Sequence, residues 1–250
     1  VTGGGGSIGS ELCRQIARAN PACLIVADHG EFNLYQIDRE LRQAYPDLEM
    51  RSRLVDITDA EAVTTLFASE GPEILFHAAA YKHVPLLEDQ VRAAVRNNIL
   101  GTQILANAAY HWGVDRFIFI STDKAVNPAN IMGATKRVAE RLCQSLDSQS
   151  RTRFIAVRFG NVLGSAGSVV PLFRTQIDQG GPVTLTHPDM ERFFMTIPEA
   201  CQLIMQAATI GRGGEIFVLD MGAPVSIRYL AEQMIRLSGH QPGRDIAIEY

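Results

Sequence analysis

Short apolar runs alternate with longer segments of helical periodicity over the first 160 residues of the chain. Each apolar run has the length of a buried strand in a parallel sheet, and each periodic segment has the pattern of an amphipathic helix. The predicted strands are residues 23–27, 74–77, 116–121 and 154–159, and the predicted helices are residues 10–19, 32–44, 60–69 and 93–110. This alternation predicts an α/β fold with a doubly wound parallel sheet.

The pattern becomes less regular after Gly160. Short helices are predicted at residues 171–178, 198–209 and 227–238, and the loops between them are rich in glycine and proline. This irregular pattern predicts a smaller, mixed part of the kind that closes over a substrate.

The two ends of the chain resemble interrupted strands. The first residue is Val1 rather than Met, and the first strand already ends at Thr2 and Gly3. Residues 246–250 have the pattern of a strand that is just beginning. We therefore expect a fragment of a longer protein. The chain itself contains no apolar run of transmembrane length and no signal peptide, so membrane attachment is expected only through segments outside it.

The composition is that of an ordinary globular protein, with 46% hydrophobic and 20% charged residues. A net charge of −4 without blocks of like charge argues against nucleic-acid binding, so an anionic ligand must be held by local groups. The four cysteines form no C-x-x-C pair, and the six histidines show no metal-like clustering. These features predict a reduced, cytoplasmic protein with structural histidines and no metal site.

A glycine-rich segment follows the first strand and opens the first helix. Its glycines at positions 3, 6 and 9 form the pattern G-x-x-G-x-x-G. Glycine allows a tight turn and a close approach of the backbone to a pyrophosphate, while the helix N-terminus presents N–H groups to the anion. The alternative is a flexible turn without a ligand. The predicted dinucleotide contacts in this segment are Gly3, Gly6, Ser7, Ile8 and Gly9.

An acidic residue ends the second strand at the spacing of a dinucleotide-binding fold. Asp28 lies 19 residues after Gly9, and a carboxylate there accepts hydrogen bonds from both ribose hydroxyls and repels a 2′-phosphate. Asp28 therefore indicates NAD rather than NADP, the alternative being a solvated turn residue before Gly30. Asp56, at the end of the third strand, is expected to face the adenine or to cap a helix that begins near Thr58. The remaining predicted cofactor contacts are Ile57, Ala78 and Ala79.

A buried strand delivers three polar residues to one edge of the predicted sheet. The strand ends at Ser121 and is followed by Thr122, Asp123 and Lys124. Ligands of open parallel sheets bind at the carboxyl ends of the strands. The alternative for Asp123 and Lys124 is a surface turn with a loose ion pair, which their place at the end of a buried strand argues against.

Two lysines elsewhere are further candidates. A helix opens at residues 131–137 and carries Met132 and Lys136 four positions apart, hence on one face. Lys136 is predicted to hold the hydroxyls of the nicotinamide ribose as a point charge, the alternative being a solvated lysine beside Arg137. Lys82 is expected either to reach the sugar or its phosphates or to lie in a surface loop.

The glycine pattern, residues 121–124 and the helix with Lys136 resemble the extended short-chain dehydrogenase/reductases, and five segments carry a closer resemblance. They are residues 5–12 (GGSIGSEL), 31–35 (EFNLY), 77–85 (HAAAYKHVP), 121–124 (STDK) and 192–196 (RFFMT). The closer resemblance is to nucleotide-sugar 4,6-dehydratases of bacterial polysaccharide and protein-glycan synthesis, and within them to the large, membrane-attached UDP-N-acetylglucosamine 4,6-dehydratases. It spans essentially the whole chain. We accordingly expect an NAD-binding Rossmann domain at residues 1–160 and a mostly substrate-binding part at residues 161–250, truncated at its C-terminal end.

The resemblance implies conversion of UDP-N-acetylglucosamine to a UDP-4-keto-6-deoxy sugar. A hydride passes from C4 to NAD, the C5 proton is removed, the C6 hydroxyl leaves as water, and the hydride returns to C6. The resemblance assigns the acid to Asp123 and the base to Lys124, while Thr122 orders the substrate. The acid must be protonated and the base neutral, so their pKa values must move towards each other.

Met132 departs from the Tyr-x-x-x-Lys pair of the wider superfamily, in which the lysine lowers the tyrosine pKa. A thioether neither accepts nor donates the proton. The membrane-attached subgroup is similar in carrying Met here. The departure leaves the base for the 4-hydroxyl unassigned, and Asp123 or a water is the expected acceptor.

Three residues of the second part are expected to bind the substrate. The resemblance assigns a contact with the sugar nucleotide to Asn161. Val170 lies near a helix start that suits a diphosphate and a uracil, and Arg192 suits a phosphate through its planar donors. The alternatives are core packing for Val170 and a salt bridge with Glu191 or Asp189 for Arg192.

Two other functions stay open. A nucleotide-sugar 4-epimerase also holds NAD, but it needs no acid at C6 and normally needs the missing tyrosine. A non-catalytic NAD-binding module that regulates a glycan-assembly partner is compatible with Met132. The resemblance also implies a homo-oligomer, built through paired helices at residues 93–110 and 132–145, which are apolar on more than one face.

Overall fold

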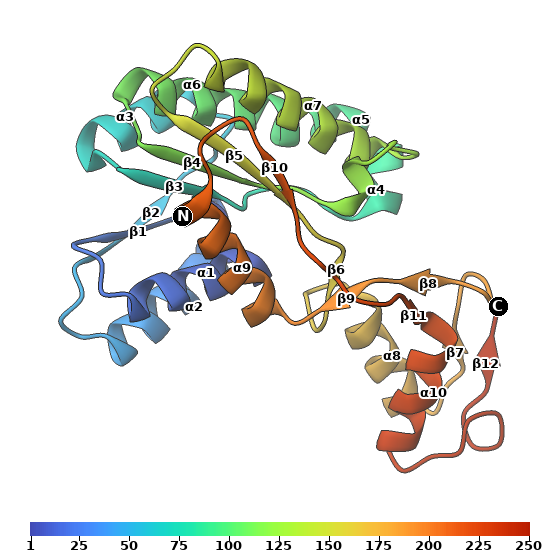
Figure 1. Cartoon of the computed structure of the whole chain (residues 1–250). Coiled ribbons are helices and arrows are strands. Elements are labelled where there is room, and N and C mark those ends of the chain that lie inside the picture. Colours follow the sequence, from blue (N-terminus) through green and yellow to red (C-terminus); the bar gives the residue numbers. More distant parts are fainter. The chain divides into compact units, whose positions relative to one another are not determined.

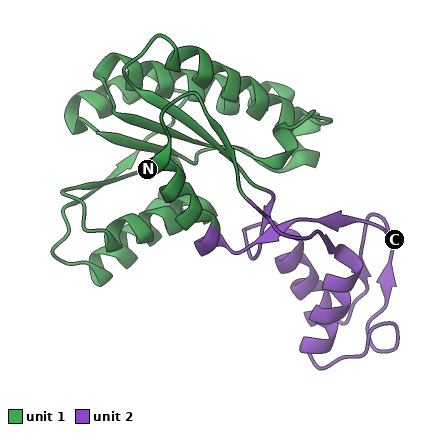
Figure 2. Cartoon of the chain, viewed as in Figure 1, with its two compact units in different colours: residues 1–159, 200–219 green, residues 160–199, 220–250 purple.

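The computed structural model describes residues 1–250, which form two compact units (Figure 2). Unit 1 comprises residues 1–159 and 200–219, and unit 2 comprises residues 160–199 and 220–250. The expectation that the second part contains all residues after 160 is therefore corrected for residues 200–219. They return to unit 1 because its last strand, β10 (Ile216–Val218), pairs in parallel with β5 (Arg153–Arg158).

Unit 1 is built on a parallel sheet. Its other strands are β1 (Leu24–Asp28), β2 (Met50–Leu54), β3 (Ile74–His77) and β4 (Arg116–Ile120). One ladder joins β1 to β2, and a second has the order β10-β5-β4-β3, with every pairing parallel. Thr2 forms parallel bridges with both Ala27 and His77, so the start of the chain lies between the two ladders and joins them.

Helices cover both faces of this sheet (Figure 1). They are α1 (Ser7–Arg18), α2 (Glu31–Ala44), α3 (Ala60–Glu70), α6 (Thr102–Trp112), α7 (Ile131–Asp147) and α9 (Ile197–Ile210). In Figure 1, α3, α6 and α7 lie on one face and α1, α2 and α9 on the other. The predicted doubly wound α/β fold is confirmed.

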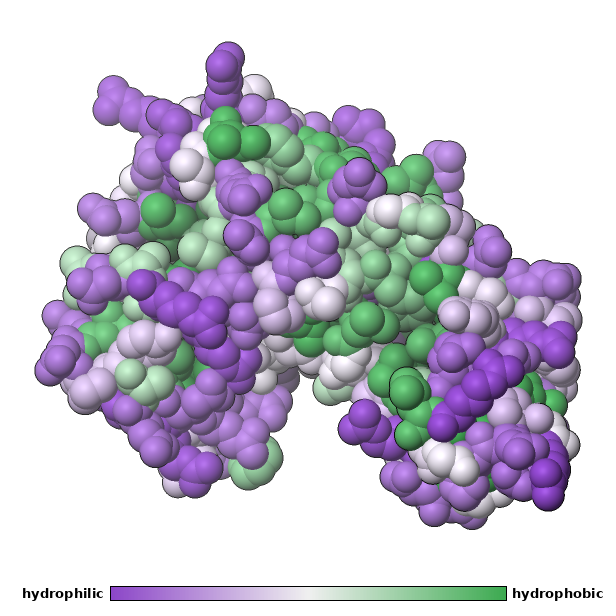
Figure 3. Space-filling model, turned by 60° about the horizontal axis from the view of Figure 1, so that its bottom comes forward, coloured by the Kyte–Doolittle hydropathy of each residue, from purple (hydrophilic) through white to green (hydrophobic).

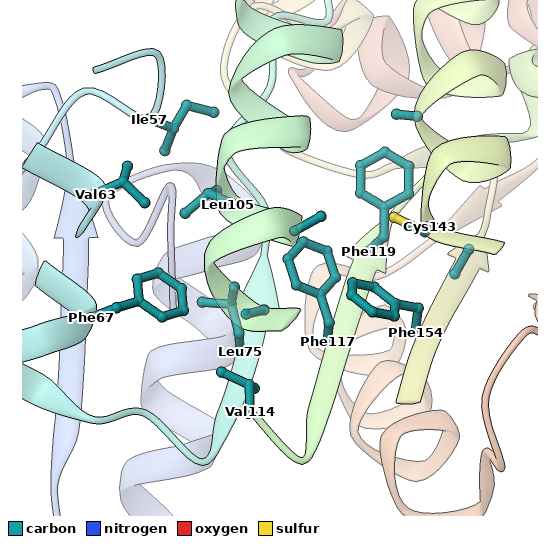
Figure 4. Close-up of a cluster of buried hydrophobic side chains, with 14 residues drawn as sticks. Ile57, Val63, Phe67, Leu75, Leu105, Val114, Phe117, Phe119, Cys143 and Phe154 are labelled. Carbon is teal, nitrogen blue, oxygen red and sulfur yellow. The ribbon is translucent and has the colours of Figure 1, made fainter. Parts of the chain in front are cut away.

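Aromatic side chains fill the space between the sheet and the layer of α3, α6 and α7 (Figure 4). Phe117 and Phe119 on β4 are fully buried, as is Phe154 on β5, and the rings of Phe117 and Phe154 lie 5.1 Å apart. Burial of each such side chain contributes about 1.5–3 kcal/mol. The packing holds β4 and β5 side by side, and with them the residues that follow each strand.

The helix predicted at residues 93–110 is interrupted. α4 (Val84–Asp89) and α5 (Val91–Ala94) precede a π-helical segment, η1 (Val95–Gly101), and α6 follows. In the π-helical segment Asn98 is buried, and its side chain hydrogen-bonds with the backbone N and O of Tyr81 at 2.9 and 3.0 Å and with Thr135 Oγ1 at 3.1 Å. A wide turn that is fixed by such distant partners leaves no mark in the local periodicity.

Unit 2 consists of short paired strands and two helices. The pairs are β6 (Asn161–Val162) with β9 (Phe194–Met195), β7 (Val183–Thr184) with β12 (Ile248–Glu249), and β8 (Glu191–Arg192) with β11 (Val225–Ser226). The helices α8 (Val169–Asp178) and α10 (Ile227–Leu237) contribute Phe173 and Ile235 to a core of their own. The strand expected at residues 246–250 is present as β12.

Apolar side chains are interspersed with hydrophilic ones on the surface (Figure 3). Five large apolar side chains of η1, α6 and α7 are 36–49% exposed: Val95, Leu100, Tyr110, Trp112 and Val138. They belong to η1, α6 and α7, the helices for which pairing is expected, and assembly through them stays a prediction. None of the helices has both the length and the hydropathy that a membrane crossing requires.

Candidate active site

The glycine-rich loop folds back onto the helix that it opens. Gly3 has a φ of +68°, and a Cβ on Gly9 would collide with the carbonyl oxygen of Gly3. Glycine accommodates both features without strain. α1 begins at Ser7, and its N-cap, Gly6, has no side chain to accept hydrogen bonds from the first turn. The helix N-terminus therefore offers backbone N–H groups and the positive end of its dipole to an anion.

The carboxylate of Asp28 is held in a fixed orientation at the end of β1. Its oxygens accept hydrogen bonds from the N–H groups of Gly5 at 2.9 Å and Gly30 at 2.8 Å, and the residue is 8% exposed. These contacts rule out the alternative that Asp28 is a solvated turn residue. Each carboxylate oxygen keeps a second lone pair for a ligand hydroxyl. Asp28 lines a cavity of about 160 Å³ together with Gly3, Gly6, Ile57, Ala78 and Ala79.

Seven further residues that the sequence analysis missed line this cavity, and four of them carry polar or aromatic side chains: His29, Asn33, Tyr81 and Asn97. The rings of His29 and Tyr81 meet edge to face, with centroids 6.4 Å apart. Asn33 lies in the first turn of α2, close enough to the glycine loop that a Cβ on Gly5 would contact it. Its place in the segment 31–35, which carries the family resemblance, is the signal from which it could have been found.

Asp56 is exposed and lines an adjoining, larger cavity of about 530 Å³ with His29 and Tyr81. Its carboxylate accepts a hydrogen bond from the N–H of Thr58 at 2.8 Å. The N-cap of α3 is Asp59, whose side chain accepts from the N–H groups of Glu61 and Ala62. The alternative of an N-cap role for Asp56 is therefore corrected, and its contact with an adenine stays a prediction.

Thr122, Asp123 and Lys124 form a hydrogen-bonded cluster just beyond β4. Asp123 Oδ1 accepts from Thr122 Oγ1 at 2.9 Å and from Lys124 Nζ at 3.0 Å. The backbone N–H of Asp123 donates to the carbonyl oxygen of Phe159, directly after β5, at 2.9 Å. The side chains of Asp123 and Lys124 are 39% and 29% exposed, so both remain accessible to a ligand. Anchoring to the neighbouring strand distinguishes the cluster from a loose surface turn.

Lys136 contacts the end of β4, just before this cluster. It is 6% exposed, its Nζ donates to the carbonyl oxygen of Ile120 at 2.7 Å, and the ammonium lies 4.6 Å from the centroid of the Phe119 ring. Burial lowers the pKa of Lys136 to about 8. The alternative of a solvated helix lysine is therefore corrected, while its contact with a ribose stays a prediction.

Met132 packs within an apolar cluster. It is 4% exposed and contacts Leu87 of α4 and Ala94 of α5. Gly133 allows the start of α7 to approach the short 3-10 turn η2 (Asp123–Ala125), because a Cβ there would collide with the carbonyl oxygen of Lys124. Met132 therefore packs among apolar side chains, a role that requires no proton chemistry.

The predicted substrate residues fall in both units. Lys82 is exposed in unit 1, whereas Asn161, Val170 and Arg192 belong to unit 2. Val170 is half-buried on α8, and Arg192 is exposed. The guanidinium of Arg192 donates to the backbone carbonyl of Glu191 at 2.7 Å and forms no ion pair with a neighbouring carboxylate, so the salt-bridge alternative is corrected. The substrate roles of all four residues stay predictions.

His77 is the most deeply buried titratable side chain near the loop. Its ring lies 2.9 Å from Thr2 Oγ1 and 2.9 Å from Thr102 Oγ1. The Thr102 hydroxyl donates to the carbonyl oxygen of Asn98 at 2.8 Å, so it accepts from Nε2–H of His77, and Nδ1 accepts from Thr2. Burial, and then the nearby Lys136, lower the pKa of His77 to about 3. No group of His, Cys, Asp and Glu side chains is arranged to hold a metal ion.

Comparison with known proteins relates this architecture to polysaccharide synthesis. The chain is 53% identical to CapD, a capsular polysaccharide biosynthesis protein of Staphylococcus aureus, over 100% of this chain and 42% of CapD. The chain spans about two fifths of the length of the first curated relatives that it matches.

Solved structures share the fold. Pen from Bacillus thuringiensis superposes with a TM-score of 0.90 and 37% identity, covering 99% of this chain and 74% of Pen. DesIV from Streptomyces venezuelae, a dTDP-glucose 4,6-dehydratase solved with NAD bound, superposes with a TM-score of 0.87 and 25% identity, covering 99% and 82%. Residues 1–250 also match the family described as polysaccharide biosynthesis protein. The chain, matched over its whole length, therefore belongs to the polysaccharide biosynthesis protein family.

Proposed function

We propose that the chain is the catalytic part of an NAD-dependent UDP-N-acetylglucosamine 4,6-dehydratase for bacterial polysaccharide or glycan synthesis. The observation that carries this proposal is the cluster of Thr122, Asp123 and Lys124, which places an acid, a base and a hydroxyl within hydrogen-bonding distance of one another. An epimerase has no use for an acid at C6. The likeness to DesIV, a dTDP-glucose 4,6-dehydratase, supports the same reaction class.

The cavity at the glycine loop fits NAD. The N-terminus of α1 suits the pyrophosphate, and Asp28 directs a fixed carboxylate towards the place of the adenosine ribose. A 2′-phosphate would meet this negative charge, so the site favours NAD over NADP. Ile57, Ala78 and Ala79 supply apolar contacts in the same cavity. When bound, NAD supplies a nicotinamide that accepts a hydride from the sugar and returns it.

Proton transfer falls to residues of the cluster. In the proposed reaction Lys124 removes the C5 proton, Asp123 protonates the departing C6 hydroxyl, and Thr122 orders the substrate at the 4-hydroxyl. The hydrogen bond of 3.0 Å between Lys124 and Asp123 lets one proton move from the ammonium to the carboxylate. That transfer produces both the neutral base and the protonated acid without change in total charge. Exclusion of water by the bound substrate favours the neutral lysine and the protonated carboxyl over the two charged groups, because desolvation disfavours charge.

The sugar nucleotide is proposed to lie against residues of unit 2. Asn161 contacts the sugar nucleotide, Val170 the uracil, and Arg192 a phosphate. For Lys82, in unit 1, the proposal is a contact with the sugar or its phosphates. The start of α8 supports this assignment, because Ser168 Oγ is buried there without a hydrogen-bond partner. The exposed guanidinium of Arg192 is suited to bidentate phosphate binding.

One incubation separates the proposed reaction from its rivals. The NAD-loaded chain, and a longer form of the protein, are mixed with UDP-N-acetylglucosamine in D₂O and followed by NMR. A dehydratase forms a 4-keto-6-deoxy sugar with deuterium at C5. A 4-epimerase forms the C4 epimer without loss of water, and a non-catalytic module leaves the substrate unchanged. Either of the last two outcomes refutes the proposal.

We further propose that the protein works as a homo-oligomer on the cytoplasmic side, anchored through segments outside this chain. The exposed apolar side chains of η1, α6 and α7 support pairing of these helices. Light scattering of Val138→Asp tests the assembly, because a charge at this 48% exposed position should dissociate a helix-paired dimer. Retention of the wild-type mass would exclude α7 from the interface.

A further inference from the structure

A fully buried carboxylate lies one helical turn beyond Lys136. Glu140 on α7 is 0% exposed and accepts four hydrogen bonds. Oε1 accepts from Ser121 Oγ at 2.6 Å and from Arg158 Nε at 2.6 Å. Oε2 accepts from Arg158 Nη2 at 2.6 Å and from Arg137 Nη1 at 3.2 Å. Each carboxylate oxygen of Glu140 therefore accepts two hydrogen bonds from within the protein.

We propose that Glu140 is a positioning residue, which fixes the position of the Thr122–Asp123–Lys124 cluster relative to Lys136. The proposal deepens the dehydratase function and rests on it. Glu140 itself has no access to substrate or cofactor, so it acts through Ser121 and Arg158.

Two partners of Glu140, Ser121 and Arg158, are adjacent in sequence to part of the cluster or its anchor. Ser121 directly precedes Thr122 at the end of β4. Arg158 ends β5, and the next residue, Phe159, accepts the hydrogen bond from the backbone of Asp123. Glu140 therefore joins α7 to both strands at the point where the cluster begins. A shift of this carboxylate would move Thr122 and Asp123 relative to Lys136.

The chemistry of the network suits alignment better than stability. A buried ion pair contributes little net stability, because the cost of desolvating two charges offsets their attraction. A bidentate pair between a planar guanidinium and a carboxylate does fix the direction of both groups. Apolar side chains of equal volume would fill the same space without setting the angle between α7 and the strands. Glu140 also lies near Lys136, where its negative charge raises the lysine pKa against the lowering effect of burial.

Glu70 offers a matched control. Its side chain is 1% exposed and pairs with two arginines, Arg51 at 3.0 Å and Arg53 at 2.6 Å, as Glu140 pairs with Arg158 and Arg137. It lies at the end of α3, outside the cluster and the cofactor cavity. Glu70→Gln therefore reproduces the loss of a buried, arginine-paired charge without touching the proposed alignment.

Hydrogen–deuterium exchange of the folded protein tests the proposal without requiring activity. In Glu140→Gln, and in the milder Ser121→Ala, the amide of Asp123 should exchange at least ~10-fold faster than in the wild type, because its segment is no longer held. Glu70→Gln should leave that amide unchanged. Unchanged exchange at Asp123 in both site variants would overturn the proposal, whether or not the chain dehydrates the sugar.

Kinetics provide the second readout. With UDP-N-acetylglucosamine, Glu140→Gln should keep its bound NAD and a KM within about threefold, while kcat falls ~10- to 100-fold, as expected for misplacement of reacting groups. The alkaline limb of its pH profile should move to lower pH, because Lys136 loses a neighbouring negative charge. Equal losses of kcat in Glu140→Gln and Glu70→Gln would reduce the role of Glu140 to stability. An inactive wild type would refute the dehydratase function instead, leaving the exchange result to decide the alignment.

Discussion

The ammonium group of Lys136 donates a hydrogen bond of 2.7 Å to the carbonyl oxygen of Ile120, and thereby joins the first turns of α7 to the last residue of β4. Burial holds the pKa of this lysine at about 8. Its charge therefore disappears in a range where most lysines remain protonated. Because Ile120 is followed by Ser121 and then by the polar cluster, the same contact lies beside the proposed site of proton transfer.

Affinity for NAD should fall as the pH rises through about 8, where Lys136 loses its proton. Below that pH the ammonium is charged and can donate hydrogen bonds to ribose hydroxyls, and above it the neutral amine binds them more weakly. Titration calorimetry at a series of pH values measures the effect. Lys136→Gln should lower the affinity and remove the pH dependence, whereas the exposed Arg39→Gln should not. An equally steep decline in Lys136→Gln would assign it to another group.

Asp28→Asn should weaken NAD binding ~10- to 100-fold, the range expected for loss of hydrogen bonds to a charged acceptor. An amide cannot accept from both Gly5 and Gly30 while serving two ribose hydroxyls. The relative affinity for NADP should rise, because the repulsion of a 2′-phosphate is removed. Fluorescence titration with both cofactors measures the ratio, with the exposed Asp47→Asn as control. An unchanged ratio would show that Asp28 does not face the ribose.

The two members of the proposed catalytic pair, Asp123 and Lys124, should fail at different steps. Asp123→Asn should lose ~10²–10⁴-fold in turnover, the contribution of a general acid–base group. Lys124→Ala should stop exchange of the C5 proton with solvent yet still permit reduction of bound NAD, seen as absorbance of NADH. Asp115→Asn, an exposed change at the opposite end of β4, serves as the control. Normal C5 exchange in Lys124→Ala would mean that another group removes this proton.

Met132→Leu should retain turnover within a few-fold and cost less than about 1.5 kcal/mol of stability, because the swap conserves apolar volume. Met132→Ala should lower the free energy of unfolding by about 2–5 kcal/mol through the cavity that it leaves against Leu87 and Ala94. Denaturant unfolding and turnover assays measure both. Loss of activity in a stable Met132→Leu protein would assign the thioether a direct part in the reaction.

Acid should destabilise the protein through His77. Its pKa is about 3 in the folded state against 6.5 ordinarily, so between these values the unfolded chain binds the extra proton. Stability therefore falls as the pH drops through this window, with a contribution approaching about 1.4 kcal/mol per pH unit. His77→Gln should remove that contribution from the slope measured by denaturant unfolding, and the exposed His111→Gln should not. Identical slopes in wild type and His77→Gln would contradict the assignment.

The sequence by itself determined most strands and helices of the first 160 residues, and which residues lie at the ends of those strands. The glycine spacing, the place of Asp28 and the exit of Thr122, Asp123 and Lys124 from a buried strand are local features. Each depends on backbone freedom or on the burial pattern of adjacent residues, which a linear sequence records. The spacing of Met132 and Lys136 on one helical face is of the same kind.

Only the tertiary structure decided which distant side chains meet. Glu140 is 18 residues from Arg158 and 19 from Ser121, and nothing in the spacing indicates that one carboxylate serves both. The π-helical turn at Val95–Gly101 depends on Asn98 reaching Tyr81 and Thr135, and the return of residues 200–219 to unit 1 depends on a free edge of β5. Periodicity reports which face of an element is buried. The partner on the other side is set by packing and charge compensation between segments far apart in the chain, which no local pattern encodes.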